Sequence, residues 1–369
     1  MRLCVPFLDD RELQEIAKVL ASGYLTQGRK VVEFEQRVAA HVGCRHAFAT
    51  SSCTTALHLS LAALGVGPGD EVLVADFTFP ATANVVVQQY ARPILVDVNL
   101  DTLTMDPEDL RRKITPRAKA VIPVDAFGCS ADMDAIGAIA RSAGLAVIED
   151  AACAIGATYK GRPCGNLGTV GCFSFHPRKV ITTGEGGMIV TDDDALAERV
   201  GLLRSHGGVH EGFRYRYEAA GFNYRLSDVL GAIGVAQMDK LAAILTRRRA
   251  LAARLKECLA DIRAVRPPAD PPWGGHIYQS FVVLLDEDLD RDRLVESLRR
   301  REIEATLGTY ALHDQPFFQR TYGYAAGQLP RSHAAFRRSV ALPFYPQMAD
   351  EDLETIARCL RESLAEQGA

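Results

Sequence analysis

Strand-like and helix-like segments alternate through the first two thirds of the chain, and this alternation constrains the fold more than any other feature. Predicted strands cover Glu71–Phe79, Ala118–Phe127 and Leu145–Asp150, and a predicted helix over Met133–Ala143 lies between the last two. The apolar run Ala120–Val124 is typical of a strand that is buried on both faces. We therefore predict an α/β domain with a mostly parallel central sheet covered by helices.

The pattern changes after about residue 226. Ser227 is a candidate N-cap for a long helix that continues to about Leu259. Prolines cluster over 267–272, and the chain ends with shorter strands and helices. We predict a large α/β domain with an N-terminal arm over residues 1–245, and a smaller C-terminal α+β domain over residues 246–369.

Composition excludes several classes of protein. The 369 residues are 48% hydrophobic and 24% charged, with a net charge of −4, so the chain is neither disordered nor collagen-like. This charge would not attract nucleic acid or an anionic membrane surface. We find no secretory signal and no apolar stretch near the roughly 18 residues of a membrane span. The nine scattered cysteines, never spaced CxxC, favour reduced thiols, so we predict a cytoplasmic protein without nucleic-acid or membrane partners.

The segment from Gly171 to Gly187 carries the most chemical information. A strand leads to Ser174, a turn that contains Pro177 leads to Lys179, and a glycine-rich turn follows. Lys179 has apolar neighbours in the sequence, and burial lowers the pKa of a lysine, so it could act as a neutral amine nucleophile toward an aldehyde. A solvated surface cation is the alternative interpretation.

Asp150 follows a buried strand, at the end where ligands bind in parallel sheets. Pyridoxal phosphate (PLP) needs a lysine for its aldehyde, an acidic partner for its ring nitrogen, and donors for its phosphate. Lys179 and Asp150 fit the first two needs. Residues Thr50–Thr55 lead into an apolar helix, whose N-terminus could bind the phosphate together with Ser174. Taken singly, Asp150 could be a turn residue and Thr50–Thr55 an ordinary helix cap.

In their order and spacing, these motifs resemble the DegT/DnrJ/EryC1/StrS family. Its members are PLP-dependent nucleotide-sugar aminotransferases with the type I (aspartate aminotransferase-like) fold of PLP-dependent transferases. The resemblance runs nearly end to end. It is carried by Gly23–Gly28, Thr50–His58, Gly67–Val72, Phe77–Thr82, Glu149–Ala152, Ser174–Lys179, Thr183–Gly187, Gly221–Leu226 and Leu342–Pro346.

The resemblance implies roles for the residues that would hold the cofactor. Lys179 would bind PLP as a Schiff base and move a proton between the cofactor-bound carbons, and Asp150 would pair with the pyridine nitrogen. Phe79 would stack on one face of the ring, although core packing is an equally good interpretation. The phosphate would be held by Thr54, Thr55 and Ser174.

The resemblance also implies partners. Asn223 matches a residue that reaches the phosphate of the other subunit, which implies a homodimer with shared active sites. Tyr310 and His313 lie in a region that would approach the sugar, although a solvated loop is an equally good interpretation for His313. Arg225 belongs to the same motif as Asn223, and we include it among the candidate substrate-binding residues.

Two cysteines depart from the family pattern. Cys53 stands at a phosphate-binding position that is usually glycine or alanine. Cys153 stands where glutamine or histidine usually lies against the cofactor ring, and a thiol is a weaker hydrogen-bond donor than either. Lys179 is retained, whereas the dehydratase branch of the family has histidine there, so transamination is favoured over dehydration.

We therefore predict a PLP-dependent aminotransferase. The resemblance implies glutamate or glutamine as amino donor and a keto group of a nucleotide-linked sugar as acceptor. Elimination or epimerisation on a sugar-like substrate, and a PLP-binding regulatory protein without turnover, are the alternatives. We expect no metal site, because Gly207 and Gly208 between His206 and His210 argue against a shared helical face.

Overall fold

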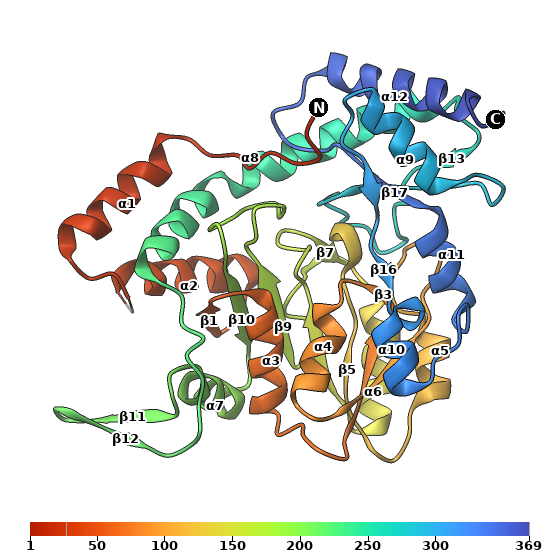
Figure 1. Cartoon of the computed structure of the whole chain (residues 1–369). Helices are drawn as coiled ribbons and strands as arrows, with labels where there is room; N and C mark the ends of the chain where they lie inside the picture. The colour runs from red at the N-terminus through yellow and green to blue at the C-terminus, as the bar shows by residue number, and fades with distance from the viewer. Residues whose placement is uncertain (27, 369) are drawn as a thin grey trace.

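A seven-stranded sheet forms the centre of the larger part of the protein, shown in Figure 1. The computed structural model describes residues 1–26 and 28–368, so Gln27 of the motif Gly23–Gly28 lies outside the described residues. The strand order is β1-β10-β9-β6-β5-β2-β4, and β10 runs in the opposite direction to the other strands of this sheet. The predicted α/β fold with a mostly parallel sheet is confirmed. The bounds are β1 (His46–Thr50), β2 (Glu71–Ala75), β4 (Arg92–Val96), β5 (Ala118–Ile122), β6 (Ala146–Asp150), β9 (Val170–Ser174) and β10 (Gly187–Thr191).

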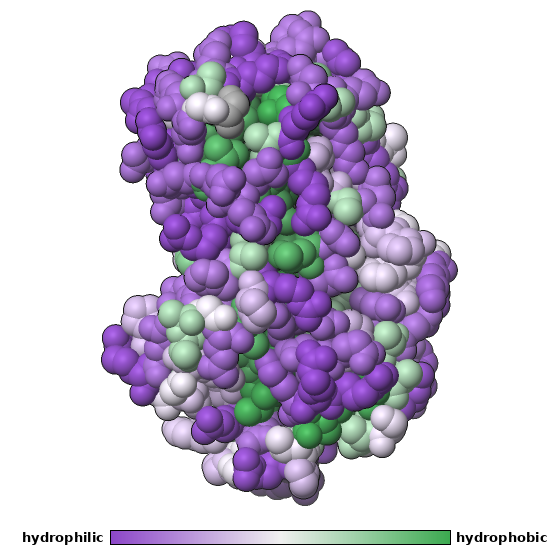
Figure 2. Space-filling model, turned by 90° about the vertical axis from the view of Figure 1, so that its right-hand side faces the viewer, coloured by the Kyte–Doolittle hydropathy of each residue, from purple (hydrophilic) through white to green (hydrophobic). Residues whose placement is uncertain are grey.

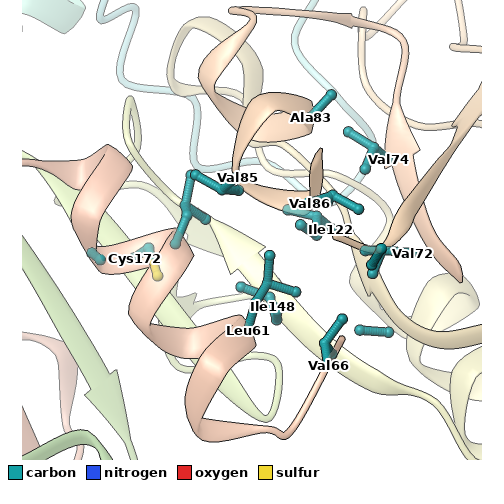
Figure 3. Packing of buried hydrophobic residues seen from close by; sticks show 14 of the residues in the cluster. Leu61, Val66, Val72, Val74, Ala83, Val85, Val86, Ile122, Ile148 and Cys172 are labelled. Atoms are coloured by element: carbon teal, nitrogen blue, oxygen red, sulfur yellow. The ribbon is translucent and has the colours of Figure 1, made fainter. Parts of the chain in front are cut away.

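Helices cover both faces of this sheet, so alternate strand residues enter different cores. Val72 and Val74 of β2 pack in one cluster with residues of α3 and α4, and Leu73 packs on the opposite face with residues of α5 and α6. Figure 3 shows the first cluster, which includes Ile148 of β6. Burial on both faces explains why these strands are continuously apolar. The helices are α2 (Arg29–Val42), α3 (Cys53–Ala63), α4 (Ala81–Gln88), α5 (Pro107–Lys113), α6 (Met133–Ala143) and α7 (Asp194–Arg204).

The long helix α8 (Asp228–Leu259) links two cores. It begins as predicted, because the Ser227 side chain caps it by accepting a hydrogen bond from the Leu230 amide. Leu241 packs in a core beneath the large sheet, with residues of α2, whereas Leu255 packs in the core of the C-terminal part. The predicted division between residues 245 and 246 thus lies inside one continuous helix.

The C-terminal part is built on a four-stranded antiparallel sheet in the order β13-β14-β17-β15. Residues of α8, α9 and α12 share its core. One segment returns to the large part, where β16 pairs with β3. The bounds are β3 (Phe77–Thr78), β13 (Val265–Arg266), β14 (Phe281–Leu285), β15 (Thr306–Leu307), β16 (Tyr310–Ala311), β17 (Ser339–Leu342), α9 (Arg291–Arg300), α10 (Pro316–Tyr322), α11 (Pro330–Arg338) and α12 (Asp350–Ala365).

Three elements lie outside these layers. Helix α1 (Asp10–Ser22) packs along α8, and the hairpin β11–β12 (Gly208–Glu211 and Arg214–Tyr217) extends away from the large part (Figure 1). A smaller hairpin pairs β7 (Thr158–Tyr159) with β8 (Arg162–Pro163). The face of the molecule in Figure 2 is mostly hydrophilic, with apolar residues in small patches.

Among the described residues, α8 alone is long and apolar enough to cross a membrane, which the sequence analysis did not anticipate. More than half of its most apolar stretch is buried against the rest of the protein. That burial is typical of the core helix of a folded domain.

Candidate active site

A cavity of about 760 Å³ lies at the carboxyl ends of β6 and β9, where the sequence predicted a ligand. Asp150 and Ser174 are the last residues of these strands, and both line the cavity. The C-terminal part contributes Gln279, Ser280 and Thr309 to the lining. No local sequence signal marked these three residues, because they reach the cavity only through the packing of one part on the other.

Lys179 enters the cavity from the turn after β9. Its backbone N–H donates to the His176 carbonyl at 2.8 Å, which closes the turn, and its Nζ donates to Sγ of Cys153 at 3.0 Å. Burial by itself would lower the pKa of the Lys179 amine, but the neighbouring Cys153 sulfur, Cys53 and Asp150 outweigh it, so the pKa is raised. The expected lowering of this pKa is therefore wrong, and so is the alternative of a solvated surface cation.

Asp150 is buried, with 4% of its surface exposed. Its Oδ2 accepts a hydrogen bond from the Thr82 hydroxyl at 2.8 Å, and its Oδ1 accepts one from the Ala152 amide at 3.2 Å. Burial raises the pKa of the Asp150 carboxyl, while these two bonds and the charge of Lys179 oppose the rise. A positively charged ligand group in the cavity would favour the ionised form. Thr82 belongs to the motif Phe77–Thr82, but the sequence alone indicated no role for it.

The N-terminus of α3 forms another wall of the cavity, through Ser51, Ser52, Cys53 and Thr54. Strand β10 passes close to it, and a Cβ on Gly187 would lie 2.4 Å from the Ser52 carbonyl carbon, so the close approach requires glycine. Backbone amides at such a helix end favour an anion.

Thr55 is not among the residues that line the cavity, and its predicted role at the phosphate stays a prediction. Its hydroxyl accepts from the Ser52 N–H at 3.0 Å, and its own amide donates to the Ser52 hydroxyl at 3.1 Å. This capping box uses the Thr55 side chain to begin the helix.

Phe79 and Phe77 have different surroundings although they are two residues apart. Both residues line the cavity, but Phe79 is 66% exposed, whereas Phe77 is 1% exposed and also packs in the core. An exposed ring at a cavity wall is available to stack on a flat ligand.

His313 lies outside the cavity lining, so the solvated-loop interpretation is wrong because of its burial, and its predicted approach to the sugar stays a prediction. The side chain is fully buried, where its Nδ1 lies 2.6 Å from Oδ2 of Asp76. The chain passes from β16 into a short helical turn over 312–314, which carries His313 beneath the surface. Tyr310 pairs with Thr78 across β16 and β3 and is likewise not among the cavity residues.

Asn223 and Arg225 lie between the hairpin β11–β12 and α8, and neither lines the cavity of its own chain. Asn223 is exposed, and Arg225 donates through Nη1 to the Ser205 hydroxyl at 3.1 Å. Their predicted roles stay predictions, since that of Asn223 concerns a second subunit.

Comparison with known proteins decides what this geometry belongs to. The profile of the DegT/DnrJ/EryC1/StrS aminotransferase family matches residues 6–361. The chain belongs to this family. The spore coat polysaccharide biosynthesis protein SpsC of Bacillus subtilis (strain 168) is 36% identical over 371 residues, which cover 97% of this chain and 95% of that protein.

Solved structures agree with the family assignment. The aminotransferase TlmJ from Streptoalloteichus hindustanus is 33% identical, with a TM-score of 0.93 over 100% of this chain and 99% of that chain. A Streptococcus pneumoniae protein solved in a PLP form is 25% identical, with a TM-score of 0.93 over 99% of each chain. The type I fold and the activity of a PLP-dependent aminotransferase follow for this member of the DegT/DnrJ/EryC1/StrS family.

The residues of the cavity fit this cofactor. The structure brings together an amine for its aldehyde, a buried carboxylate for its ring nitrogen, and a helix N-terminus with the Ser174 hydroxyl for its phosphate. Phe79 provides an exposed ring beside them. Lys179 and Asp150 both line this cavity.

Proposed function

We propose that the chain transfers an amino group from glutamate or glutamine to a keto group of a nucleotide-linked sugar. One observation carries this proposal: the Lys179 amine and the buried Asp150 carboxylate line one cavity at the carboxyl ends of parallel strands. The relative SpsC is a spore coat polysaccharide biosynthesis protein, which supports a sugar acceptor. The volume of about 760 Å³ leaves room for a substrate beside the cofactor.

When bound, PLP supplies an electron sink and a carbonyl carbon that carries the amino group between the two substrates. In this proposal Lys179 holds the cofactor through Nζ and moves the proton at the reacting carbon. Asp150 keeps a proton on the ring nitrogen, and Thr82 holds its Oδ2 in place. The pKa of Lys179 is raised, so the amine must give up its proton before it can act as a nucleophile or base.

The phosphate would be bound by Ser174, by Thr54 and by the amides at the start of α3, which include that of Cys53. Cys153 would lie beside the cofactor ring, next to Lys179. These assignments extend the geometry of one chain, and Asn223 would complete the neighbouring site in a homodimer. Its exposure in the single chain supports this placement.

The proposal also includes the location of the enzyme in the cell and the boundary between its two domains. We place the enzyme in the cytoplasm, which the nine free cysteines support. We place the domain boundary near residue 245, which the two separate cores along α8 support.

The test begins with absorbance. We expect purified protein to be yellow, and borohydride to bleach the band and fix the cofactor on Lys179, as peptide mapping would show. As a control, Lys160→Ala should leave the absorbance band and the labelling of Lys179 unchanged, because Lys160 is exposed and paired with Asp134, away from the cavity. In protein that has not been treated with borohydride, glutamate or glutamine should shift the band, and a panel of nucleotide-linked keto sugars should restore it. A band that neither donor shifts would contradict the proposed donors.

A further inference from the structure

Cys153 and Lys179 bring a thiol and an amine into direct contact. Nζ lies 3.0 Å from Sγ, and both side chains line the large cavity. The family resemblance predicts glutamine or histidine at position 153. Neither could form a covalent bond with a lysine by simple oxidation, whereas an oxidised cysteine can react with a nitrogen nucleophile.

We propose that Cys153 and Lys179 form a reversible sulfur–nitrogen cross-link under hydrogen peroxide, which removes the lysine from catalysis. First, the Cys153 sulfur attacks one peroxide oxygen, the O–O bond breaks, and water leaves. The sulfur becomes a sulfenic acid, oxidised by two electrons, and the peroxide is reduced. Next, the neutral Nζ attacks this sulfur, the S–O bond breaks, and the hydroxyl leaves as water with a proton from the nitrogen. Two equivalents of a small thiol reverse the bond and release its disulfide.

The surroundings distinguish Cys153 from the buried cysteines. Burial raises the pKa of the Cys53, Cys164 and Cys172 thiols, so they stay protonated and react slowly with peroxide. Cys153 is partly exposed, and the cavity gives peroxide a path to it.

The cross-link needs a lysine that is not attached to the cofactor. Under the proposed function, Nζ is free whenever the amino group has moved onto the cofactor, and it is also free in the chain without PLP. Bound PLP on Lys179 should therefore protect the pair. The cross-link would act as a stop on the enzyme under oxidative conditions, and thiols would release it.

The experiment treats the full chain with hydrogen peroxide, both as purified with PLP and after removal of PLP. Digestion and mass spectrometry should find, mainly after PLP removal, a peptide pair joining positions 153 and 179 that has lost two hydrogen atoms. Dithiothreitol should separate the pair and restore PLP binding. The PLP absorbance before treatment reports the proposed function separately, so the two proposals can fail independently.

Variants locate the bond. Cys153→Ala should lose the cross-linked peptide completely, whereas Cys258→Ala should keep it, since Cys258 is also partly exposed but lies on α8 near its C-terminal end. Lys179→Arg should stop at the sulfenic acid, which dimedone traps on Cys153. Cys53→Ala should keep the cross-link, which separates it from a disulfide with the same loss of two hydrogens.

Three results for the cross-linked peptide would overturn the proposal. These are a peroxide-treated chain with no cross-linked peptide, a bond that disappears in Cys53→Ala, or a bond that forms equally with PLP bound. A sulfenic acid that persists on Cys153 while Lys179 is free would also overturn it, because the amine at 3.0 Å would then have failed to react.

Discussion

Asp150 and Asp76 occupy similar positions in the sheet but have different partners. Asp150 ends β6, and Asp76 follows the last residue of β2, so both carboxylates lie at the carboxyl ends of parallel strands. Asp76 is fully buried against the His313 imidazole at 2.6 Å and its backbone amide at 2.8 Å. The Asp150 carboxylate accepts from Thr82 and Ala152, and it faces the cavity.

The difference teaches how a strand end becomes a functional site. A buried carboxylate needs hydrogen bonds or a cation. The C-terminal part supplies the His313 imidazole and backbone amide to Asp76, which makes that pair structural. No imidazole among the described residues does the same for Asp150, so a ligand cation can take that place.

The largest effect we expect is on stability, from Asp76→Asn. It removes the charge that faces His313 in a fully buried pair, and breaking such a pair costs about 3–5 kcal/mol. Chemical denaturation should show this loss, while the PLP absorbance of the folded fraction stays unchanged. Asp134→Asn, at an exposed ion pair, should cost far less stability, because solvent screens such a pair. Equal losses for both variants would remove the distinction between the buried pair and the surface.

Asp150→Asn should show the reverse pattern. Hydrogen bonds to charged groups contribute about 1.5–3 kcal/mol, so we expect amino transfer to fall by about 10²-fold. The folded protein should be as stable as before, because burial already opposes the charge of Asp150 and raises the pKa of its carboxyl. Single-turnover kinetics and denaturation of the same preparation measure both effects. A stability loss as large as that of Asp76→Asn would show that the two carboxylates have the same role.

The pH dependence of stability should report on the Asp76–His313 pair. Burial opposes the charge on His313, but Asp76 outweighs it and raises the pKa of the imidazole. The folded protein therefore holds this proton more tightly than the unfolded chain. The stabilisation is complete below the ordinary histidine pKa of about 6.5 and is lost as the pH rises through the higher folded value.

The difference in unfolding free energy between the wild type and His313→Gln should accordingly shrink as the pH rises above about 6.5, the ordinary histidine pKa. His41→Gln is the control, since burial lowers the pKa of His41 and no such decline is expected there. A constant difference across this range would mean that His313 is neutral in the folded protein.

The smallest effect we expect is on PLP binding, from Phe79→Ala, with Phe77→Ala as the comparison in the core. Phe79→Ala should weaken PLP binding by about 0.5–1.5 kcal/mol, the usual contribution of an aromatic pair, without loss of stability. Phe77→Ala should instead destabilise the fold by about 3–5 kcal/mol, because that ring is buried. Titration with PLP and denaturation separate the two results. Unchanged PLP affinity in Phe79→Ala would leave its ring without a role at the cavity.

Much of the fold was predictable from local pattern. The helix at Met133–Ala143 has the predicted bounds, and the strand ending at Asp150 begins within one residue of the prediction. The strand predicted over Glu71–Phe79 is divided, because β2 ends at Ala75 and Phe77–Thr78 forms the separate strand β3 with Tyr310–Ala311. The apolar run could not show this, since both pieces are equally buried.

The predicted site residues likewise fall into two groups, those that line the cavity and those that do not. Lys179, Asp150 and Ser174 were placed correctly at the cavity because each follows or ends a strand of the parallel sheet. Thr55 and His313 do not line the cavity. Their side chains bond to a helix cap and to a distant aspartate, and neither partner can be identified from the residue type alone.

The sequence by itself determined the α/β class, the long helix from Ser227, and the lysine and carboxylate that PLP requires, because these depend on local spacing and on strand ends. Tertiary structure alone decided which aspartate contacts the His313 imidazole, which threonine faces the cavity, and that Cys153 touches Lys179. Those outcomes depend on contacts between residues far apart in the chain. The raised pKa of Lys179 shows the reason: burial has a predictable sign, but neighbours brought in by folding reversed it.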